Sequence, residues 1–152
     1  MPKPKVFITR TIPDKGLEII KDICDIDLWS DELPPSREDL LQHVQGVDGL
    51  LSLLTDKIDN EVMEEAGPQL KVISNFAVGF DNIDIHAATA RRIPVGNTPN
   101  VLTDATADFA FALMMAVARR IPEAERYVHE ENGKPGVQRP CLALKSKARP
   151  SV

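Results

Sequence analysis

The sequence is poor in cysteine and in long apolar runs. Its 152 residues include only two cysteines, Cys24 and Cys141, which are too few and too far apart for a disulfide framework or a zinc site. The longest apolar run, residues 109–118, is about half as long as a membrane-spanning helix requires. We therefore expect no metal site, no membrane span and no export signal, and a reducing compartment makes the cytoplasm the expected location.

Basic and aromatic residues are also scarce. The chain carries 18 Lys and Arg against 23 Asp and Glu, which gives a formal net charge of −5. It has one Trp and one Tyr, so it offers no aromatic platform on which bases could stack. This composition argues against nucleic acid or an anionic membrane as the main partner and favours a small molecule.

Short apolar segments alternate with helix-like segments over the first two thirds of the chain. Ser36, Asp59 and Asp84 are of the residue types that cap helix N-termini, and each precedes a predicted helix. A further helix is predicted over residues 14–23. Strands are predicted over residues 5–10, 25–29, 49–54, 70–74 and 93–95. Consecutive parallel strands need crossover helices, so the alternation predicts an α/β fold with a doubly wound parallel sheet.

In such a sheet, ligands bind outside the carboxyl ends of the strands. The loops of interest therefore follow Thr9, Leu54, Asn75 and Val95. The loop after the fourth strand contains Gly79, which permits either a positive φ or close approach of the backbone to a ligand. The adjacent N–H groups of Val78 and Gly79 could grip a carboxylate without a charged side chain, although a plain strand-to-helix turn explains the same residues.

An apolar helix is predicted from about Thr106 to Arg120. Its apolar residues lie on every side, so it must be buried on most of them, and the sheet can cover only one. We infer a missing cover, which is another domain, another subunit or both. The predicted division is a domain at residues 1–101, an interface helix region at 102–133 and a tail at 134–152.

The last 21 residues differ in charge from the rest. They hold five basic residues and no acidic one, with no helical or strand periodicity. The plain interpretation is a disordered basic tail. The sharper interpretation is that the chain leaves its proper sequence near Gly133.

Two long motifs carry a family resemblance. The segments 78–84 (VGFDNID) and 92–110 (RIPVGNTPNVLTDATADFA) closely resemble the D-isomer-specific 2-hydroxyacid dehydrogenases, and among them the glyoxylate and hydroxypyruvate reductases. The resemblance covers residues 3 to about 133. It implies a flavodoxin-like substrate domain followed by a Rossmann cofactor domain, and reduction of a 2-keto acid to a D-2-hydroxy acid by NADH or NADPH.

The resemblance also implies roles for particular residues. The backbone N–H groups of Val78 and Gly79 would bind the substrate carboxylate, and Leu54 would line the substrate pocket. Thr106 would contact the cofactor, NAD or NADP. The helix that carries Thr106 would pack in a dimer interface, which would supply the missing cover.

The departures from the family are equally informative. None of the eight glycines forms the Gly-x-Gly-x-x-Gly phosphate cradle, and none of the three histidines falls on a family catalytic position. No catalytic residue is therefore assigned, and no cofactor is expected to bind these residues tightly. The resemblance stops where the charge changes, which favours a frameshift, an alternative splice or a premature end and predicts a catalytically silent chain. Two alternatives are a non-catalytic module that pairs with itself or with full-length subunits through residues 103–131, and a stand-alone carboxylate-binding module.

Other candidate residues have plainer interpretations. His86 is expected on the surface or at a helix cap, and Cys24 in the core. Asp56, Asp81 and Asp84 could form an acidic pocket of the phosphate-accepting type, but turn and cap roles are favoured.

Overall fold

The computed structural model describes residues 2–129. The chain divides into two compact units, the first spanning Met1–Val101 and the second beginning at Leu102. The predicted tail at 134–152 lies outside the described residues.

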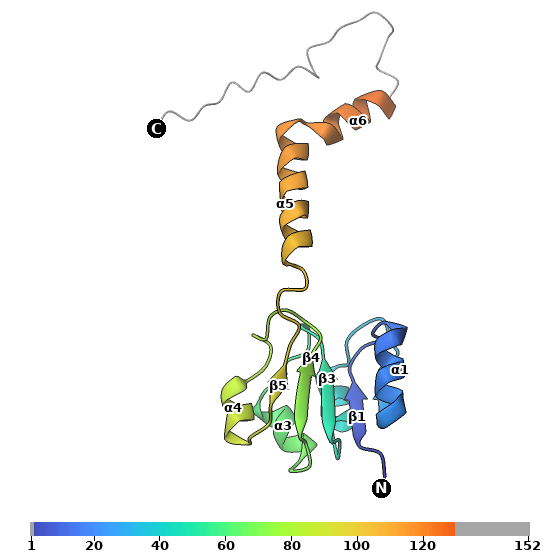
Figure 1. The fold of residues 1–152 in the computed structure, drawn as a ribbon, viewed down its shortest axis with the longest axis vertical. Helices are drawn as coiled ribbons and strands as arrows, with labels where there is room; N and C mark the ends of the chain where they lie inside the picture. The colour runs from blue at the N-terminus through green and yellow to red at the C-terminus, as the bar shows by residue number, and fades with distance from the viewer. Residues whose placement is uncertain (1, 130–152) are drawn as a thin grey trace, which may run out of the picture. The chain divides into compact units, whose positions relative to one another are not determined.

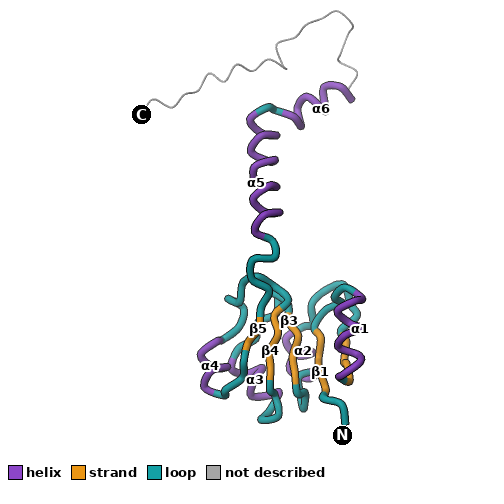
Figure 2. The backbone as a smooth tube through the Cα atoms, in the orientation of Figure 1, coloured by secondary structure: helices purple, strands orange, loops and turns teal. Residues whose placement is uncertain are grey.

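The first unit is built on a five-stranded sheet (Figures 1 and 2). The strands stand in the order β2-β1-β3-β4-β5, and each neighbouring pair is parallel. This is the flavodoxin-like strand order. The predicted α/β fold with a parallel sheet is confirmed. The strands are β1 (Lys5–Ile8), β2 (Asp25–Leu28), β3 (Gly49–Ser52), β4 (Val72–Asn75) and β5 (Val95–Gly96).

Helices cover both faces of the sheet. They are α1 (Asp14–Ile23), α2 (Arg37–His43), α3 (Asn60–Ala66) and α4 (Ile85–Ala90). Phe7 belongs to the main buried cluster, with side chains of α2, α3 and α4, whereas Ile8 belongs to a smaller cluster with Leu17 of α1. Successive strand residues point to opposite faces, so Phe7 and Ile8 face these two cores.

The three predicted helix caps are confirmed. The side chains of Ser36, Asp59 and Asp84 each accept a hydrogen bond from the backbone N–H three residues later. These bonds satisfy N–H groups that the first turn of a helix leaves unpaired. α3 stops at Gly67, whose φ of 91° is easily reached only by glycine.

All five strands differ from their predicted bounds at one end or both, and for β3 and β5 the structure shows the reason. β3 ends at Ser52, not at Leu54, because the carboxylate of Asp56 accepts the Leu53 N–H at 2.8 Å and bends the chain into a turn. β5 begins at Val95, not at residue 93. The Ile93 N–H donates to the carbonyl of Ala88 at 2.9 Å, and Pro94 has no N–H to give to the sheet.

The described part of the second unit consists of two helices, α5 (Thr103–Ala118) and α6 (Ile121–His129). α5 begins about one turn before the predicted start at Thr106. α6 was not predicted. Arg120 separates the two helices. Its φ of 53° lies in the left-handed region, and a right-handed helix cannot continue through a residue with that backbone conformation.

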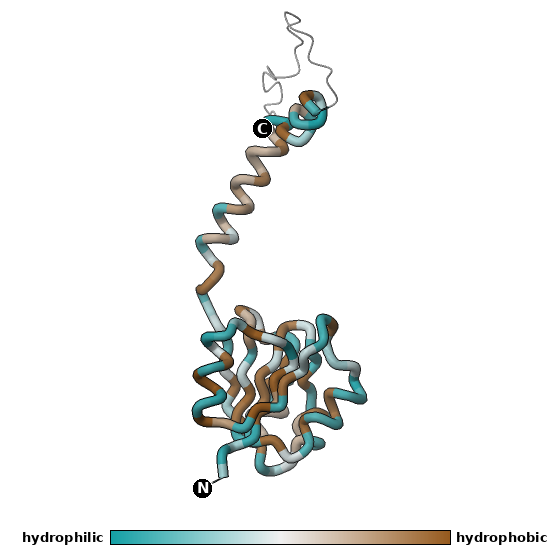
Figure 3. The backbone as a smooth tube through the Cα atoms, turned by 90° about the vertical axis from the view of Figure 1, so that its right-hand side faces the viewer, coloured by the Kyte–Doolittle hydropathy of each residue, from teal (hydrophilic) through white to brown (hydrophobic). Residues whose placement is uncertain are grey.

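The apolar side chains of α5 are exposed in this chain. None of its residues is buried, and Phe109, Phe111, Leu113 and Met114 are each more than half exposed. Figure 3 shows hydrophobic residues along much of this helix. The exposure is what the all-round apolar pattern of α5 led us to expect, and a cover from another domain or subunit stays a prediction. In the described part of the chain, no helix combines the length and apolarity needed to cross a bilayer.

Candidate functional site

The segment between β4 and α4 carries the two backbone groups predicted to bind a carboxylate. It leaves the sheet beside β3, because the Phe76 N–H donates to the carbonyl of Ser52 at 2.7 Å. Val78 and Gly79 are both exposed. Among the described residues, no acceptor for the N–H of either residue is found. Two adjacent unpaired N–H groups are suited to share one carboxylate.

Gly79 leaves open space at this point. Its φ is not positive, so a left-handed backbone, one of the two reasons considered for a glycine here, does not apply. A Cβ added to Gly79 would meet only Asp81 Oδ2, at 3.8 Å, which is ordinary van der Waals contact. Neither backbone strain nor packing within the described chain requires glycine. The remaining reason from the sequence is close approach of a ligand.

Leu54 lies on the neighbouring loop, in the turn after β3, and is 66% exposed. The guanidinium of Arg10, which follows β1, donates to Thr55 Oγ1 at 3.4 Å and to the carbonyl of Glu32 at 3.1 Å. These bonds place a positive charge beside the loop that carries Leu54. An anion at this edge of the sheet would therefore meet a favourable charge.

Asparagine side chains join these two loops. Asn82 Nδ2 donates to the carbonyl of Leu53 at 3.0 Å and to that of Asp56 at 2.9 Å. Asn75 Nδ2 donates to Asn82 Oδ1 at 3.0 Å and to the carbonyl of Gly79 at 2.9 Å. The turn that carries Leu54 and the segment that carries Gly79 are therefore held by one set of hydrogen bonds.

The network extends into the core. Asp56 is 4% exposed, and its carboxylate accepts a bond of 2.5 Å from the buried hydroxyl of Thr9. Ser52 Oγ donates to Asn75 Oδ1 at 3.1 Å, and both residues are buried. Buried polar groups that are fully paired fix a single arrangement. Sequence reasoning missed this network, although its members end β1, β3 and β4 or closely follow them.

The structure accounts for most of the other candidates. Asp56 closes a turn and Asp84 caps α4, which confirms the turn and cap roles favoured for them, whereas Asp81 is exposed. His86 is on the surface, as expected. Cys24 is only half-buried, so its assignment to the core is wrong. It follows α1, whose last residue, Ile23, is exposed. In the part of the chain that the structure describes, no three His, Cys, Asp or Glu gather as metal ligands.

The clearest electrostatic perturbation lies at the N-terminus of α3, where Asp59 is the cap. Burial by itself would raise the pKa of Asp59. The hydrogen bonds from Arg37, at 2.6 Å, and from the Val62 N–H outweigh burial, and the pKa is lowered. Glu61 also pairs with Arg37, and the two carboxylates raise the pKa of the Arg37 guanidinium. These ion pairs connect α2 to the start of α3, so we assign them a structural role.

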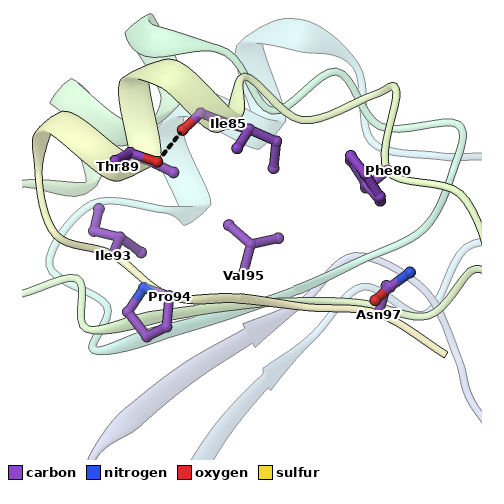
Figure 4. A pocket seen from close by; sticks show the side chains of 8 residues that line it. Phe80, Ile85, Thr89, Ile93, Pro94, Val95 and Asn97 are labelled. Carbon is purple, nitrogen blue, oxygen red and sulfur yellow. Dashed lines mark hydrogen bonds between the residues drawn. The ribbon is translucent and has the colours of Figure 1, made fainter. Parts of the chain in front are cut away.

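Figure 4 shows a pocket of about 310 Å³ between α4 and β5. Phe80 and Asn97 lie at one end of it, and Thr89 and Ile93 at the other. The hydroxyl of Thr89 donates a hydrogen bond to the carbonyl of Ile85 at 2.7 Å. The lining is mostly apolar, and none of the predicted site residues belongs to it.

Thr106 lies on α5, in the second unit, where its N–H donates to the carbonyl of Leu102 at 2.8 Å. Its contact with a cofactor stays a prediction.

Comparison with known proteins identifies the family. The family model described as "D-isomer specific 2-hydroxyacid dehydrogenase, catalytic domain" matches residues 6–137. The chain belongs to this family. A curated member, a glyoxylate reductase of Korarchaeum cryptofilum, is 56% identical over 128 residues, covering 84% of this chain and 38% of that protein. The chain thus spans less than half the length of this 2-hydroxyacid dehydrogenase relative.

Solved structures show the same fold. The TT0316 protein from Thermus thermophilus is 39% identical, with a TM-score of 0.82 over 91% of this chain and 44% of that chain. A putative NAD-binding D-isomer-specific 2-hydroxyacid dehydrogenase from Polaromonas is 30% identical, with a TM-score of 0.79, and the match covers 93% of this chain and 44% of that one. The described residues share the fold of the corresponding part of these proteins.

Proposed function

We propose that this chain supplies the carboxylate-binding part of an NAD(P)-dependent oxidoreductase that reduces glyoxylate, or a similar small 2-keto acid, to a D-2-hydroxy acid. The observation that carries the proposal is the pair of unpaired N–H groups on Val78 and Gly79, with open space in front of Gly79. The similarity to glyoxylate reductases supports the choice of substrate, and the family resemblance supports NAD or NADP as the hydride donor.

The residue roles in this proposal are those that the family resemblance implies. The N–H groups of Val78 and Gly79 bind the carboxylate, which orients the keto carbon, and the exposed side chain of Leu54 contacts the substrate from the neighbouring loop. Thr106 contacts the cofactor. Hydride transfer needs a bound cofactor and a proton donor, and these 152 residues contain no Gly-x-Gly-x-x-Gly motif. We therefore expect this chain by itself to bind the keto acid without reducing it.

The test is a titration of the ¹⁵N-labelled chain with glyoxylate, followed by NMR. The amide signals of Val78 and Gly79 should shift together. Gly79→Val should abolish the shifts, because its side chain would occupy the open space through which a ligand approaches the backbone, whereas Val78→Ala should bind as the wild type does, since the contact uses the backbone. Equal loss in both variants would contradict the proposal. NADPH oxidation by the purified chain, at a rate proportional to its concentration, would contradict the expected lack of catalysis.

A second candidate function rests on α5. Its exposed apolar residues, among them Phe109, Phe111 and Leu113, favour association with a second copy or with a full-length family subunit through residues 103–131. Analytical ultracentrifugation of the chain should show dimers that Phe111→Glu weakens. Co-expression with an intact paralogue should recover a mixed complex. Recovery of monomer alone in both experiments would exclude this function.

A further inference from the structure

We infer that Asn97 is a positioning residue of the carboxylate site, and that its side chain fixes the peptide whose N–H belongs to Gly79. The inference deepens the proposed function and rests on it for the identity of the ligand. The geometry of the loop can be tested without any ligand.

The direction of the two N–H groups is set by the carbonyls that precede them. The carbonyl of Val78 accepts a bond of 2.7 Å from Asn97 Nδ2, and the carbonyl of Ala77 accepts one of 2.9 Å from the Thr98 N–H. The described peptides are all trans, and the C=O and N–H of a planar trans peptide point in opposite directions. The N–H groups of Val78 and Gly79 therefore both point away from residues 97–98.

Asn97 is itself held in place by the sheet. It directly follows β5, whose residues Val95 and Gly96 pair with Ile73 and Ser74 of β4. Its side chain is half-buried, and Figure 4 shows it at the end of the pocket where Phe80 lies. The pairing of β5 with β4 thus positions the side-chain amide of Asn97 beside the loop that follows β4.

Asn97 and Asn75 differ in what else they hold. Asn75 donates to the carbonyl of Gly79, but it also bonds to Ser52 and Asn82 and is 1% exposed, so its loss would disturb the core. Among residues 2–129, the side-chain hydrogen bond of Asn97 goes to Val78 alone. Removing that amide should therefore loosen one peptide and leave the fold intact.

The matched control is Thr98. Its bond to Ala77 uses the backbone N–H, which Thr98→Val retains with nearly the same side-chain shape. Asn97→Ala and Asn97→Asp both remove the amide donor, and the second keeps the size of the side chain. All three variants should unfold at the urea concentration of the wild type.

The experiment measures backbone order parameters of the full 152-residue chain without ligand, followed by glyoxylate titration. In Asn97→Ala and Asn97→Asp the order parameter of the Gly79 N–H should fall from about 0.85 toward about 0.6, with no change in Thr98→Val. The dissociation constant for glyoxylate should rise about 2- to 12-fold in Asn97→Ala, as expected for one lost hydrogen bond.

Each outcome decides one claim. An unchanged Gly79 order parameter in both Asn97 variants overturns the inference, and so does an unchanged affinity when the wild type binds. A wild-type chain whose Val78 and Gly79 signals ignore glyoxylate refutes the proposed function. In that case the order parameters still decide whether Asn97 fixes the peptide.

Discussion

Asn82 offers the sharpest test of how the site loops are held. Asn82→Ala removes the hydrogen bonds to the carbonyls of Leu53 and Asp56 and the bonds shared with Asn75. A protein hydrogen bond contributes a net of about 0.5–1.5 kcal/mol, and a buried partner left unpaired costs about 1–3 kcal/mol. The free energy of unfolding of the first unit should therefore fall by about 2–4 kcal/mol.

Urea unfolding followed by circular dichroism measures this loss. For a domain of this size the thermal midpoint should drop by about 10–25 °C. Asn60→Ala is the matched control, because Asn60 is exposed and, in the described part of the chain, its side chain pairs with Arg91 alone. The control should lose less than about 0.5 kcal/mol. A loss below about 1 kcal/mol in Asn82→Ala would refute the reasoning that the network holds the two loops.

Two further predictions concern the core and the charges. Leu50 is 2% exposed on the central strand β3, so Leu50→Ala should cost about 2–5 kcal/mol of unfolding free energy, whereas the exposed Leu54→Ala should cost little, as urea titrations will show. The pKa of Asp59 is lowered in the folded state, so its ionised form stabilises the fold above pH 3.8, and stability should be lost as the pH falls through the folded pKa. Arg37→Met should flatten this part of the pH–stability curve, and an unchanged curve would contradict the role assigned to the Arg37 pair.

The features that the sequence predicted correctly are mostly local. A cap such as Ser36 needs only the N–H of Asp39, three residues away, so the local sequence suffices to place it. The bounds of β3 depend on more than its own residues. The strand looks apolar as far as Leu54, and only the Asp56 carboxylate, which accepts a hydrogen bond from Thr9 just after β1, shows why it stops at Ser52.

The asparagine network could not be predicted for the same reason. Asn82 bonds to residues that lie 26 and 29 positions earlier, and Asn97 to one 19 positions earlier. These contacts exist only because neighbouring strands end at one edge of the sheet. The sequence did predict that edge, and the family motif indicated Val78 and Gly79. It did not indicate which side chains fix the direction of their N–H groups.

The geometry of the site also predicts how weakly this chain should bind. Two hydrogen bonds to a charged ligand contribute about 3–6 kcal/mol, and association costs at least about 4 kcal/mol in lost freedom. The remainder, at most about 2 kcal/mol, corresponds to a dissociation constant of about 30 mM or weaker. Hydrogen bonds from two neutral N–H groups therefore orient a bound carboxylate but contribute little affinity for it. The affinity of the proposed enzyme for its substrate should therefore come mainly from groups other than Val78 and Gly79. Submillimolar binding of glyoxylate by this chain would contradict this expectation and would indicate a further contact. Arg10 is the first residue to test for that contact.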